Sequence, residues 1–405
     1  MPLRVMAVQT STVSSSETRV VDTLLSALDR SHDGRASSVS TLLLQGVDPS
    51  TDGAGNPGDL AAARAGNVRV ENLRIGSLGR PDGRRLSKVR KLASLGRLIG
   101  GWNRLLVTAR EFDPHVVYSS QQLWDVRVAT RLARALTLPQ VVHLHYVCGP
   151  WLGPGVLDVL RTADRVLCVS DFIRGNAIDH GVLPARAVTL RNSLSPTPEP
   201  STGRLARRAL VRGELRVQDD AVLVGMCARL APWKGQEELL TAMLPILTAD
   251  PRVHLVIAGG EHPRPNGMTS RMRQKAASAD LTDQIHLLGH RSDVSGLLQA
   301  IDVFAHPSRA EPCAMAVLEA MAHGLPVVAW REGGTVELVR HGDTGILVEP
   351  LDIIALREAL LALVRDDELR RRLGSGARRT IERCFRPEDA GTLFRSTLEA
   401  AAAHC

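Results

Sequence analysis

The sequence VFAHPSRAEPCAMAVLEAMAHGLPVVAW (residues 303–330) indicates the fold more clearly than any other stretch of the chain. The apolar run VFAHPS at its start has the composition of a buried strand, and LPVVAW at its end has the same character. Between them, CAMAVLEAMAHG has the composition of a helix. A strand, a helix and a second strand in this order predict one unit of a parallel sheet that is covered by helices.

The same alternation of short apolar strands and amphipathic helices continues along almost the whole chain. The strands predicted in the first half are LRVMAVQT, SVSTLLLQG, HVVYSS, QVVHLHY, RVLCVS and AVTLR. Those predicted in the second half are AVLVGMCAR, VHLVIAGG, QIHLLGH, VFAHPS, LPVVAW and TGILVEP. Continuous Val, Ile and Leu runs are typical of strands covered on both faces. The sequence therefore predicts an α/β protein of two Rossmann-like domains that face each other across a ligand cleft at the carboxyl ends of their strands.

The length and one proline-rich segment define the expected domains. A chain of 405 residues fits two domains of about 200 residues better than one core. The segment SLSPTPEPSTG (residues 193–203) has three prolines and no periodicity, which is typical of a linker. We expect a first domain over residues 1–195 and a second over residues 196–386. Residues 387–405 are expected to form a helix that packs back toward the first domain.

Composition favours a cytoplasmic globular protein. The chain is 44% hydrophobic with a mean hydropathy of −0.03, and no apolar run approaches the roughly 18 residues of a membrane span. The start, MPLRVMAVQT, leads directly into a strand, so we expect no signal peptide. Six cysteines are scattered without any C-x-x-C, a pattern that suits a reducing compartment and predicts no structural zinc.

Positive charge is concentrated in the first half of the chain. The net charge is +7, and residues 64–110 hold twelve Lys and Arg against two acidic residues. A basic segment raises the hypothesis of a nucleic-acid partner. This segment lacks the interleaved aromatics that stack on bases, and the whole chain is only 3% aromatic, so we expect no nucleic acid.

Two glutamates in the opening stretch are candidate ligand-binding residues. Glu311 follows the predicted strand VFAHPS, where ligands of parallel sheets bind, and Glu319 lies eight positions later in the predicted helix. The start of this helix offers free N–H groups and a positive dipole end, which suit a diphosphate. The two carboxylates could hold hydroxyl groups of one elongated ligand. The alternative interpretation is that Glu311 compensates the helix dipole and Glu319 is solvated.

Two cations follow the first strand of the second half, in AVLVGMCARLAPWKG. Arg229 follows the strand and Lys234 comes five residues later, at the start of the next helix. Two fixed cations at such a turn would stabilise the charge that develops on a departing diphosphate. The alternative is an ordinary surface pair. Because the chain contains no D-x-D motif to hold a metal ion, we predict chemistry that needs no metal and no other cofactor.

In this order and spacing the motifs resemble the retaining glycosyltransferases of family 4, which have the GT-B fold. The resemblance rests on CARLAPWKG, on the Glu311 and Glu319 pair, and on HGLPVVAWREGGTVELVRHGDTGILVEPLD. It extends over nearly the whole chain through FDPHVVYSS, VVHLHY, LCVSDFIRGNAIDHGV, VTLRNS and IHLLGHRSDVSGLLQAIDVFAHPS. The resemblance implies an acceptor-binding first domain and a second domain that binds a nucleotide sugar.

The resemblance also implies roles for particular residues. Arg229 and Lys234 would bind the diphosphate, Glu311 the hydroxyl groups of the donor sugar, and Glu319 the ribose. The backbone N–H groups of Met315 and Ala316 would contact the phosphates of the donor. His290 and Arg291 would contact the nucleobase, and His145 would contact the donor sugar. His143, two residues earlier on the same strand face, is the second choice for this histidine; its alternative is a satisfied histidine inside the fold.

The sequence departs from the family pattern at three places. The first loop has Ser15 and Ser16 where the family usually has a glycine pair, and serine approaches phosphate less readily. These serines are therefore candidates for acceptor binding. Position 314 is Ala where Gly is common, and Asn192 is followed by Ser193 in place of Gly. These changes are expected to adjust the pocket and leave the class unchanged.

The sequence therefore predicts a bacterial enzyme of the hexosyltransferase type. It would move a hexose or N-acetylhexosamine with retention from a UDP-sugar, with GDP- or ADP-sugars second, to a small-molecule acceptor such as an aminocyclitol. Front-face displacement is favoured because no first-domain carboxylate occupies a nucleophile motif. The alternatives are a lipid-linked cell-envelope acceptor and a catalytically silent sugar-binding protein. An oxidoreductase is set aside because no G-x-G-x-x-G follows the first strand.

The basic segment RRLSKVRKLASLGRLIGGWNRLLVTAREF (residues 84–112) has an apolar stripe at helical spacing. A basic amphipathic helix of this kind can bind an anionic membrane surface. The alternative is a crossover helix whose stripe packs on the first sheet, as the fold requires before HVVYSS. We favour packing on the sheet, and with it a soluble acceptor.

Overall fold

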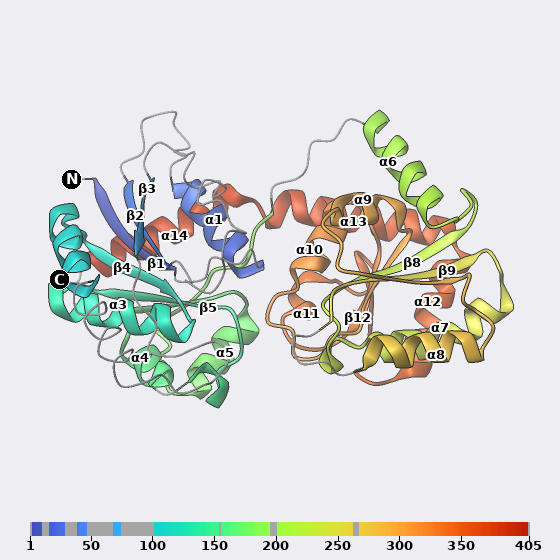
Figure 1. Cartoon of the computed structure of the whole chain (residues 1–405), viewed down its shortest axis with the longest axis horizontal. Coiled ribbons are helices and arrows are strands. Elements are labelled where there is room, and N and C mark those ends of the chain that lie inside the picture. The colour runs from blue at the N-terminus through green and yellow to red at the C-terminus, as the bar shows by residue number, and fades with distance from the viewer. Residues whose placement is uncertain are drawn as a thin grey trace, which may run out of the picture. The chain divides into compact units, whose positions relative to one another are not determined.

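The chain forms two compact units in the computed structural model. The structure describes residues 2–9, 16–28, 39–46, 68–73, 101–153, 155–194, 201–261 and 267–403. Unit 1 comprises residues 1–193 together with 387–405, and unit 2 comprises residues 194–386 (Figure 1). The chain therefore enters unit 2 after one linker and returns to unit 1 for its last helix.

Unit 1 is built on a parallel sheet with the order β3-β2-β1-β4-β5-β6-β7. Its strands are β1 (Leu3–Gln9), β2 (Val39–Gly46), β3 (Val68–Leu73), β4 (Val116–Ser120), β5 (Gln140–Leu144), β6 (Arg165–Cys168) and β7 (Ala187–Thr189). Its described helices are α1 (Ser16–Leu28), residues 101–112, α3 (Leu123–Leu136), the short η2 (Pro150–Leu152), α4 (Val156–Thr162), α5 (Asp171–Asp179) and α14 (Pro387–Ala402).

Helices cover both faces of the unit 1 sheet. On one face, α3 and helix 101–112 pack on β1, β2 and β4 through fully buried side chains such as Leu105 and Leu132. The last helix, α14, packs on α1 and on the opposite face, where the Phe394 ring lies 5.0 Å from the ring of Tyr118 on β4. The Arg395 guanidinium donates to the carbonyl of Leu28 at the end of α1, at 2.6 Å. Residues 387–402 are thus an integral layer of this unit.

Unit 2 has a parallel sheet with the order β10-β9-β8-β11-β12-β13. Its strands are β8 (Val222–Cys227), β9 (Val253–Ala258), β10 (Ile285–Gly289), β11 (Val303–His306), β12 (Val327–Trp330) and β13 (Gly345–Val348). Its helices are α6 (Ser201–Glu214), η3 (Pro232–Lys234), α7 (Gln236–Ala249), α8 (Met268–Ser278), α9 (Val294–Ala300), α10 (Met315–Ala322), α11 (Thr335–Leu338), α12 (Ile353–Arg365) and α13 (Asp367–Cys384). One apolar core lies under α6, α9, α10 and α13, and a second lies under α7, α8 and α12.

The predicted fold class is confirmed, because both units are parallel α/β sheets with helices on both faces. One strand was missed. β3 (VRVENL) is an edge strand that pairs with β2 alone, and its charged residues interrupt the apolar run that marks the other strands. The linker expected to end at Gly203 was also drawn too long, since α6 begins at Ser201.

The basic segment of residues 84–112 is described only from residue 101 onward, and its earlier residues lie outside the described part of the chain. In that part Leu105 is fully buried, and Trp102 and Leu106 pack against the core of unit 1. This portion therefore packs on the sheet, as a crossover helix does. In the described ranges no helix is long and apolar enough to span a bilayer.

Candidate active site

The candidate site of unit 2 lies where the strand order of its sheet reverses. β8 and β11 are neighbours in the sheet, and the connections after them lead to opposite sides of the order. Ligands of open α/β sheets bind in the crevice that this reversal leaves at the carboxyl ends of the strands. Arg229 and Lys234 follow β8, and Glu311 follows β11, so the sequence places all three at this crevice.

The structure brings Lys234 and Glu311 into direct contact. The Lys234 Nζ donates to Glu311 Oε2 at 2.5 Å, and the Ser308 hydroxyl donates to the same oxygen at 2.7 Å. Both charged side chains are largely buried, with 19% and 13% exposure. His306 Nε2 lies 3.8 Å from the same carboxylate oxygen, beyond hydrogen-bond distance. A carboxylate and an ammonium group are therefore fixed together at the carboxyl ends of β8 and β11.

The environment keeps Glu311 ionised. Burial by itself raises the pKa of this carboxyl group, but the neighbouring His306 and Lys234 lower the pKa by more than burial raises it. The net result is a pKa well below the usual range of glutamate. Glu311 is therefore a hydrogen-bond acceptor at neutral pH, which suits it to bind hydroxyl groups.

Glycine geometry explains why the two loops meet so closely. Gly235 has φ +81°, and a Cβ at this position would lie 2.0 Å from the carbonyl oxygen of Pro307. The Arg309 N–H also donates to the carbonyl of Trp233 at 2.8 Å. Because no larger side chain fits at position 235, the glycine that follows Lys234 allows the loop after β8 to lie against the loop after β11.

The backbone of Glu311 is fixed from its other side. Gly334 N–H donates to the carbonyl of Glu311 at 2.7 Å, and a Cβ on Gly333 would lie 2.7 Å from that carbonyl. Ala310 has φ +48°, a strained conformation for a residue with a side chain. Strained backbone of this kind occurs where surrounding contacts impose it, often in functional sites. The E-G-G sequence at 332–334 thus positions Glu311.

Arg229 differs from Lys234 in its surroundings. Its side chain is exposed, and within the described residues it forms no ion pair. Its backbone carbonyl accepts a hydrogen bond from the buried Gln236 at 3.0 Å, which holds the loop after β8 in place. The crevice therefore offers one cation already paired with Glu311 and one available cation.

The start of α10 is open. Met315 and Ala316 are its first two residues, and the N-cap residue Ala314 supplies no side-chain hydrogen bond to them. The first N–H groups of a helix lack partners within the helix and attract anions. Ala314 has φ −77°, which any residue adopts, so the alanine that replaces the family's glycine causes no backbone strain.

The other predicted donor residues are Glu319 in α10 and His290 and Arg291 after β10. Burial raises the pKa of the Cys227 thiol at the end of β8 to about 12, and the charge of Glu319 adds to this rise whereas that of Arg291 opposes it. Arg291 is not free, because its guanidinium donates to Glu214 on α6 at 3.0 Å. His290 is exposed. Sequence reasoning did not predict the contact between Arg291 and Glu214.

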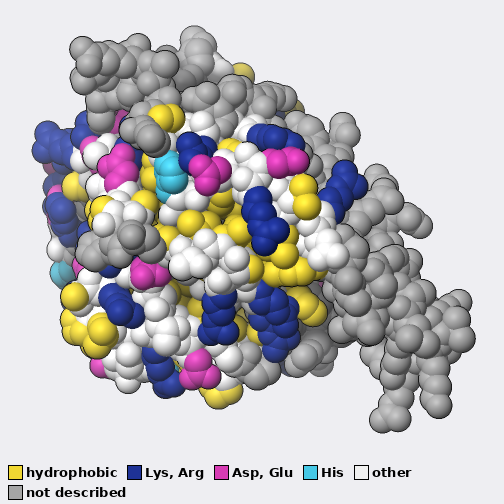
Figure 2. Space-filling model, turned by 90° about the vertical axis from the view of Figure 1, so that its left-hand side faces the viewer, with side chains coloured by type: hydrophobic (Ala, Val, Ile, Leu, Met, Phe, Trp, Pro, Cys, Tyr) yellow, Lys and Arg dark blue, Asp and Glu magenta, His cyan; other side chains and the backbone are white. Residues whose placement is uncertain are grey.

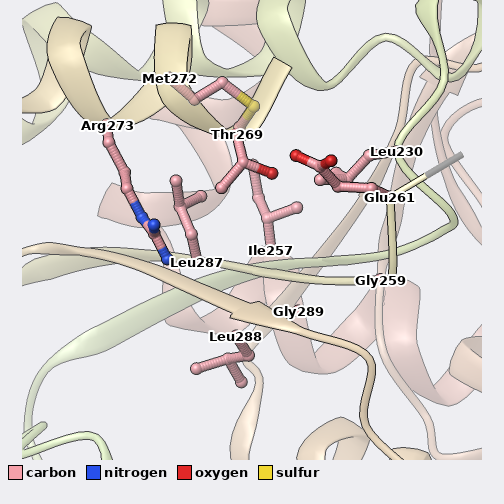
Figure 3. A pocket seen from close by; sticks show the side chains of 10 residues that line it. All are labelled: Leu230, Ile257, Gly259, Glu261, Thr269, Met272, Arg273, Leu287, Leu288 and Gly289. Atoms are coloured by element: carbon pink, nitrogen blue, oxygen red, sulfur yellow. The ribbon is translucent and has the colours of Figure 1, made fainter. Parts of the chain in front are cut away.

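A pocket of about 130 Å³ opens beside this crevice at the carboxyl ends of β9 and β10. Figure 3 shows the Glu261 side chain pointing toward Thr269 of α8, with Arg273 further along the same helix. Gly259 belongs to the lining, and a Cβ there would lie 1.8 Å from the carbonyl oxygen of Ala228. The sequence analysis missed these residues. The glycine pair in AGGEHP after β9 was the available signal.

In unit 1 the two predicted histidines lie together at the end of β5. Their rings are 4.1 Å apart between centroids, and both side chains are buried. Tyr118 on β4 forms a 2.9 Å hydrogen bond with His143 Nδ1. Burial, and then the neighbouring His145, lower the pKa of His143 well below 6.5, so His143 is neutral at physiological pH. His143 is thus buried with its Nδ1 hydrogen bonded to Tyr118, whereas its Nε2 has no hydrogen-bond partner among the described residues.

Polar residues that the sequence analysis did not select support His145. The Gln121 side-chain oxygen accepts from the backbone N–H of His145 and, at 3.1 Å, from that of Tyr146. The buried Asp125 accepts from the Ser120 hydroxyl at 2.8 Å. Ser120 ends β4, and Gln121 and Asp125 follow it, so these three residues form a polar edge at the carboxyl end of β4, which contacts His145 through Gln121.

The remaining predicted positions are described in part. Ser15 lies outside the described residues, and Ser16 is the first residue of α1, whose side chain is not described. Asn192 and Ser193 follow β7 and are both buried.

Comparison with known proteins places both units in one fold class. A model of "Glycosyltransferase Family 4" matches residues 60–197, and a model of "Glycosyl transferases group 1" matches residues 208–380. The structure of Anabaena HepE in complex with UDP and glucose superposes with a TM-score of 0.76 at 21% identity, covering 98% of this chain and all of that one. Sucrose-phosphate synthase from Thermosynechococcus elongatus gives 0.75 at 18% identity and covers all of both chains. Unit 1 and unit 2 are the two domains of a GT-B fold.

The relatives that match in sequence carry the names of glycosyltransferases. The chain is 30% identical over 278 residues to the D-inositol 3-phosphate glycosyltransferase of Salinispora arenicola, covering 65% of this chain and 61% of the relative. It is 33% identical over 182 residues to that of Corynebacterium glutamicum, covering 44% and 43%. The match thus spans about half the length of these relatives. Unit 1 is therefore similar to family 4 glycosyltransferases and unit 2 to group 1 glycosyltransferases, and both have the domain architecture of the GT-B fold.

Proposed function

We propose that this chain is a retaining glycosyltransferase that moves a hexose or N-acetylhexosamine from a nucleotide-diphosphate sugar to a small hydroxylated acceptor. The observation that carries the proposal is the buried Lys234 and Glu311 pair in the crevice between β8 and β11, with Arg229 exposed beside it. Both charges are positioned by loops whose glycines allow no larger residue.

Arg229, Lys234 and the start of α10 would bind the diphosphate. As the bond to the sugar breaks, negative charge develops on the departing phosphate, and fixed cations stabilise that charge without reorganisation. Helix N–H groups at Met315 and Ala316 would add a second, uncharged contact. Because the cations supply the electrostatic stabilisation, we propose that the transfer needs no metal ion.

The two glutamates would bind hydroxyl groups at the two ends of the donor. Glu311, ionised and held by Lys234 and Ser308, would accept from hydroxyls of the sugar. Glu319, one turn into α10, would accept from the ribose hydroxyls, with His290 and Arg291 at the nucleobase. His145 is proposed to contact the transferred sugar during the reaction.

Front-face displacement is the mechanism that the described carboxylates favour. A double displacement needs an accessible carboxylate nucleophile. In unit 1 the carboxylate of the polar edge, Asp125, is buried and hydrogen bonded to Ser120. Glu311 is held by Lys234. We therefore propose that the acceptor hydroxyl attacks the face from which the phosphate leaves and passes its proton to the departing oxygen.

A UDP-sugar is the proposed donor, and a cyclitol or another small polyol the proposed acceptor. The solved structure with UDP and glucose and the relatives named for inositol 3-phosphate support this choice. A relative at 30% identity is named as GDP-mannose-dependent, so GDP-mannose is the donor to compare first.

The test is a screen of UDP-, GDP- and ADP-sugars for slow donor hydrolysis and for thermal stabilisation, with and without EDTA. We expect one nucleotide class to stabilise the protein and to be hydrolysed at the same rate in EDTA. Loss of hydrolysis in EDTA that Mg²⁺ or Mn²⁺ restores would contradict metal independence. Stabilisation by a nucleotide sugar without hydrolysis or transfer to any polyol would indicate a sugar-binding protein instead.

A further inference from the structure

A groove of about 370 Å³ lies between α3 and α4 on unit 1. Its volume falls in the range of small-molecule sites, which is roughly 300–1,000 Å³. Neither Glu311 and its neighbours nor the buried histidines contribute to its lining. The groove is therefore a feature that the proposed sugar transfer leaves unexplained.

Three arginines of α3 form one wall of this groove. Arg127, Arg131 and Arg134 are spaced by four and three residues, which places them on one face of the helix. At 1.5 Å per residue they span about 10 Å. Among the described residues none of the three forms an ion pair, although Arg127 lies over the exposed ring of Trp124, 5.8 Å from its centroid. Three neighbouring cations without carboxylate partners are the usual footprint of an anion site.

The opposite wall does not neutralise this charge. Asp158 of α4 is the single carboxylate in the lining, and it is already paired with Arg161 at 3.1 Å. Two threonines, Thr130 and Thr162, also line the groove, and their hydroxyls donate to the carbonyls of Val126 and Asp158 at 2.7 and 2.9 Å. The groove therefore keeps an excess of positive charge.

The bottom of the groove is apolar. Val126 and Val156 are each 1% exposed, and Val159 lies beside them in the lining. Figure 2, which views the molecule from the left-hand side of Figure 1, shows basic side chains beside exposed hydrophobic ones on this side. A ligand that satisfies both parts of this surface has an anionic group and a small apolar portion.

We propose that the α3–α4 groove binds an organic phosphate monoester. The phosphate would lie against the guanidinium groups of α3, since planar guanidinium donors match phosphate oxygens in pairs. The apolar portion would lie on Val159, the lining valine that is only half-buried. This proposal uses no residue of the proposed sugar-transfer site, so an experiment can refute one proposal without refuting the other.

The probe is phenyl phosphate, titrated by calorimetry at low salt into the full chain. The chain carries Arg229→Ala and Lys234→Ala, which remove the cations of the proposed diphosphate site. We expect saturable binding that weakens as salt is added, and no binding of benzyl alcohol, which lacks the phosphate. Adding Arg127→Gln, Arg131→Gln and Arg134→Gln should weaken binding by about tenfold or more. The matched control, Arg104→Gln with Arg110→Gln, removes exposed arginines of helix 101–112 and should leave binding unchanged.

A second arm distinguishes the source of the phosphate. Vesicles of phosphatidylcholine with and without phosphatidic acid, whose headgroup is a phosphate monoester, are offered to the same variants in a flotation assay. Binding of phenyl phosphate without vesicle binding assigns a free organic phosphate. Binding to phosphatidic acid vesicles that the triple arginine variant loses assigns a lipid headgroup. Absence of binding in both arms, or equal binding by the triple variant and the control, would overturn the proposal.

Discussion

At the carboxyl edge of the unit 2 sheet, the side chains that follow β8 and β11 are charged and paired, as Lys234 and Glu311 show. At the same edge of unit 1, the side chains at the ends of β4 and β5 are buried and largely uncharged, with Tyr118 hydrogen bonded to a neutral His143. The two sheets share the same order of their first six strands, to which unit 1 adds β7, but their edges differ in chemistry. Fixed charge suits the binding of a diphosphate, whereas an uncharged edge suits a hydroxylated acceptor.

Removing the charges of unit 2 should have the largest effect. We expect Glu311→Gln, Lys234→Ala and Arg229→Ala each to lower turnover by about 10²-fold or more, because each removes a contact to developing charge or to the sugar. Steady-state kinetics with the donor found in the screen measures this.

The control pair is Glu349→Gln and Arg331→Ala, which breaks an exposed ion pair at 3.2 Å elsewhere in unit 2 and should leave turnover unchanged. Circular dichroism confirms folding, which matters most for Lys234→Ala because it leaves a buried carboxylate unpaired. Turnover rates near wild type in all three folded variants would show that these residues do not form the active site.

The comparison also predicts that His145 acts on the sugar and not on the nucleotide. His145→Ala should impair sugar transfer far more than it weakens binding of the free nucleotide diphosphate. Kinetics and calorimetry on the same protein measure the two quantities. Equal losses in both, or a larger catalytic loss in His143→Ala, would show that the wrong histidine was chosen.

Sequence patterns identified the strands of unit 2 and the residues at their ends, since continuous apolar runs mark buried parallel strands. They could not identify the contact between Lys234 and Glu311, which are 77 positions apart and meet only because β8 pairs with β11. The pairing of Arg291 with Glu214 was not predicted for the same reason, since these residues are also 77 positions apart. Gln121 was overlooked because an isolated glutamine in a loop carries no pattern.

Two glycines of unit 2 have nearly the same positive φ but different surroundings. Replacing each by alanine therefore separates the loss of stability caused by backbone strain from the loss caused by a steric clash. Gly235 (φ +81°) would place a Cβ 2.0 Å from the Pro307 carbonyl oxygen, whereas Gly342 (φ +79°) has nothing within 4 Å. We expect Gly342→Ala to lower the free energy of unfolding by about 1 kcal/mol, the cost of a left-handed alanine.

Gly235→Ala should cost more, by about 1–3 kcal/mol beyond this value, because the loops after β8 and β11 must also separate. Urea unfolding measures both variants. The same change should lower turnover, since it moves Lys234 away from Glu311, while Gly342→Ala should not. Equal losses of stability would mean that the two loops do not pack as closely as described.

The smallest expected effect concerns His143 at the edge of the unit 1 sheet. The pKa of His143 is well below 6.5 in the folded state, whereas in the unfolded chain it is about 6.5. As the pH falls below about 6.5, the unfolded state therefore takes up a proton before the folded state does. Stability is lost in this window, by up to about 1.4 kcal/mol per pH unit for one proton.

Urea unfolding between pH 7 and pH 5 should show this dependence of stability on pH. The variant His143→Gln, which keeps a hydrogen-bonding partner for Tyr118, should make the slope shallower. The exposed His290→Gln is the matched control and should leave the slope unchanged. A slope that His143→Gln does not alter would mean that His143 is not kept neutral by burial, and the contrast between the two edges would lose its electrostatic basis.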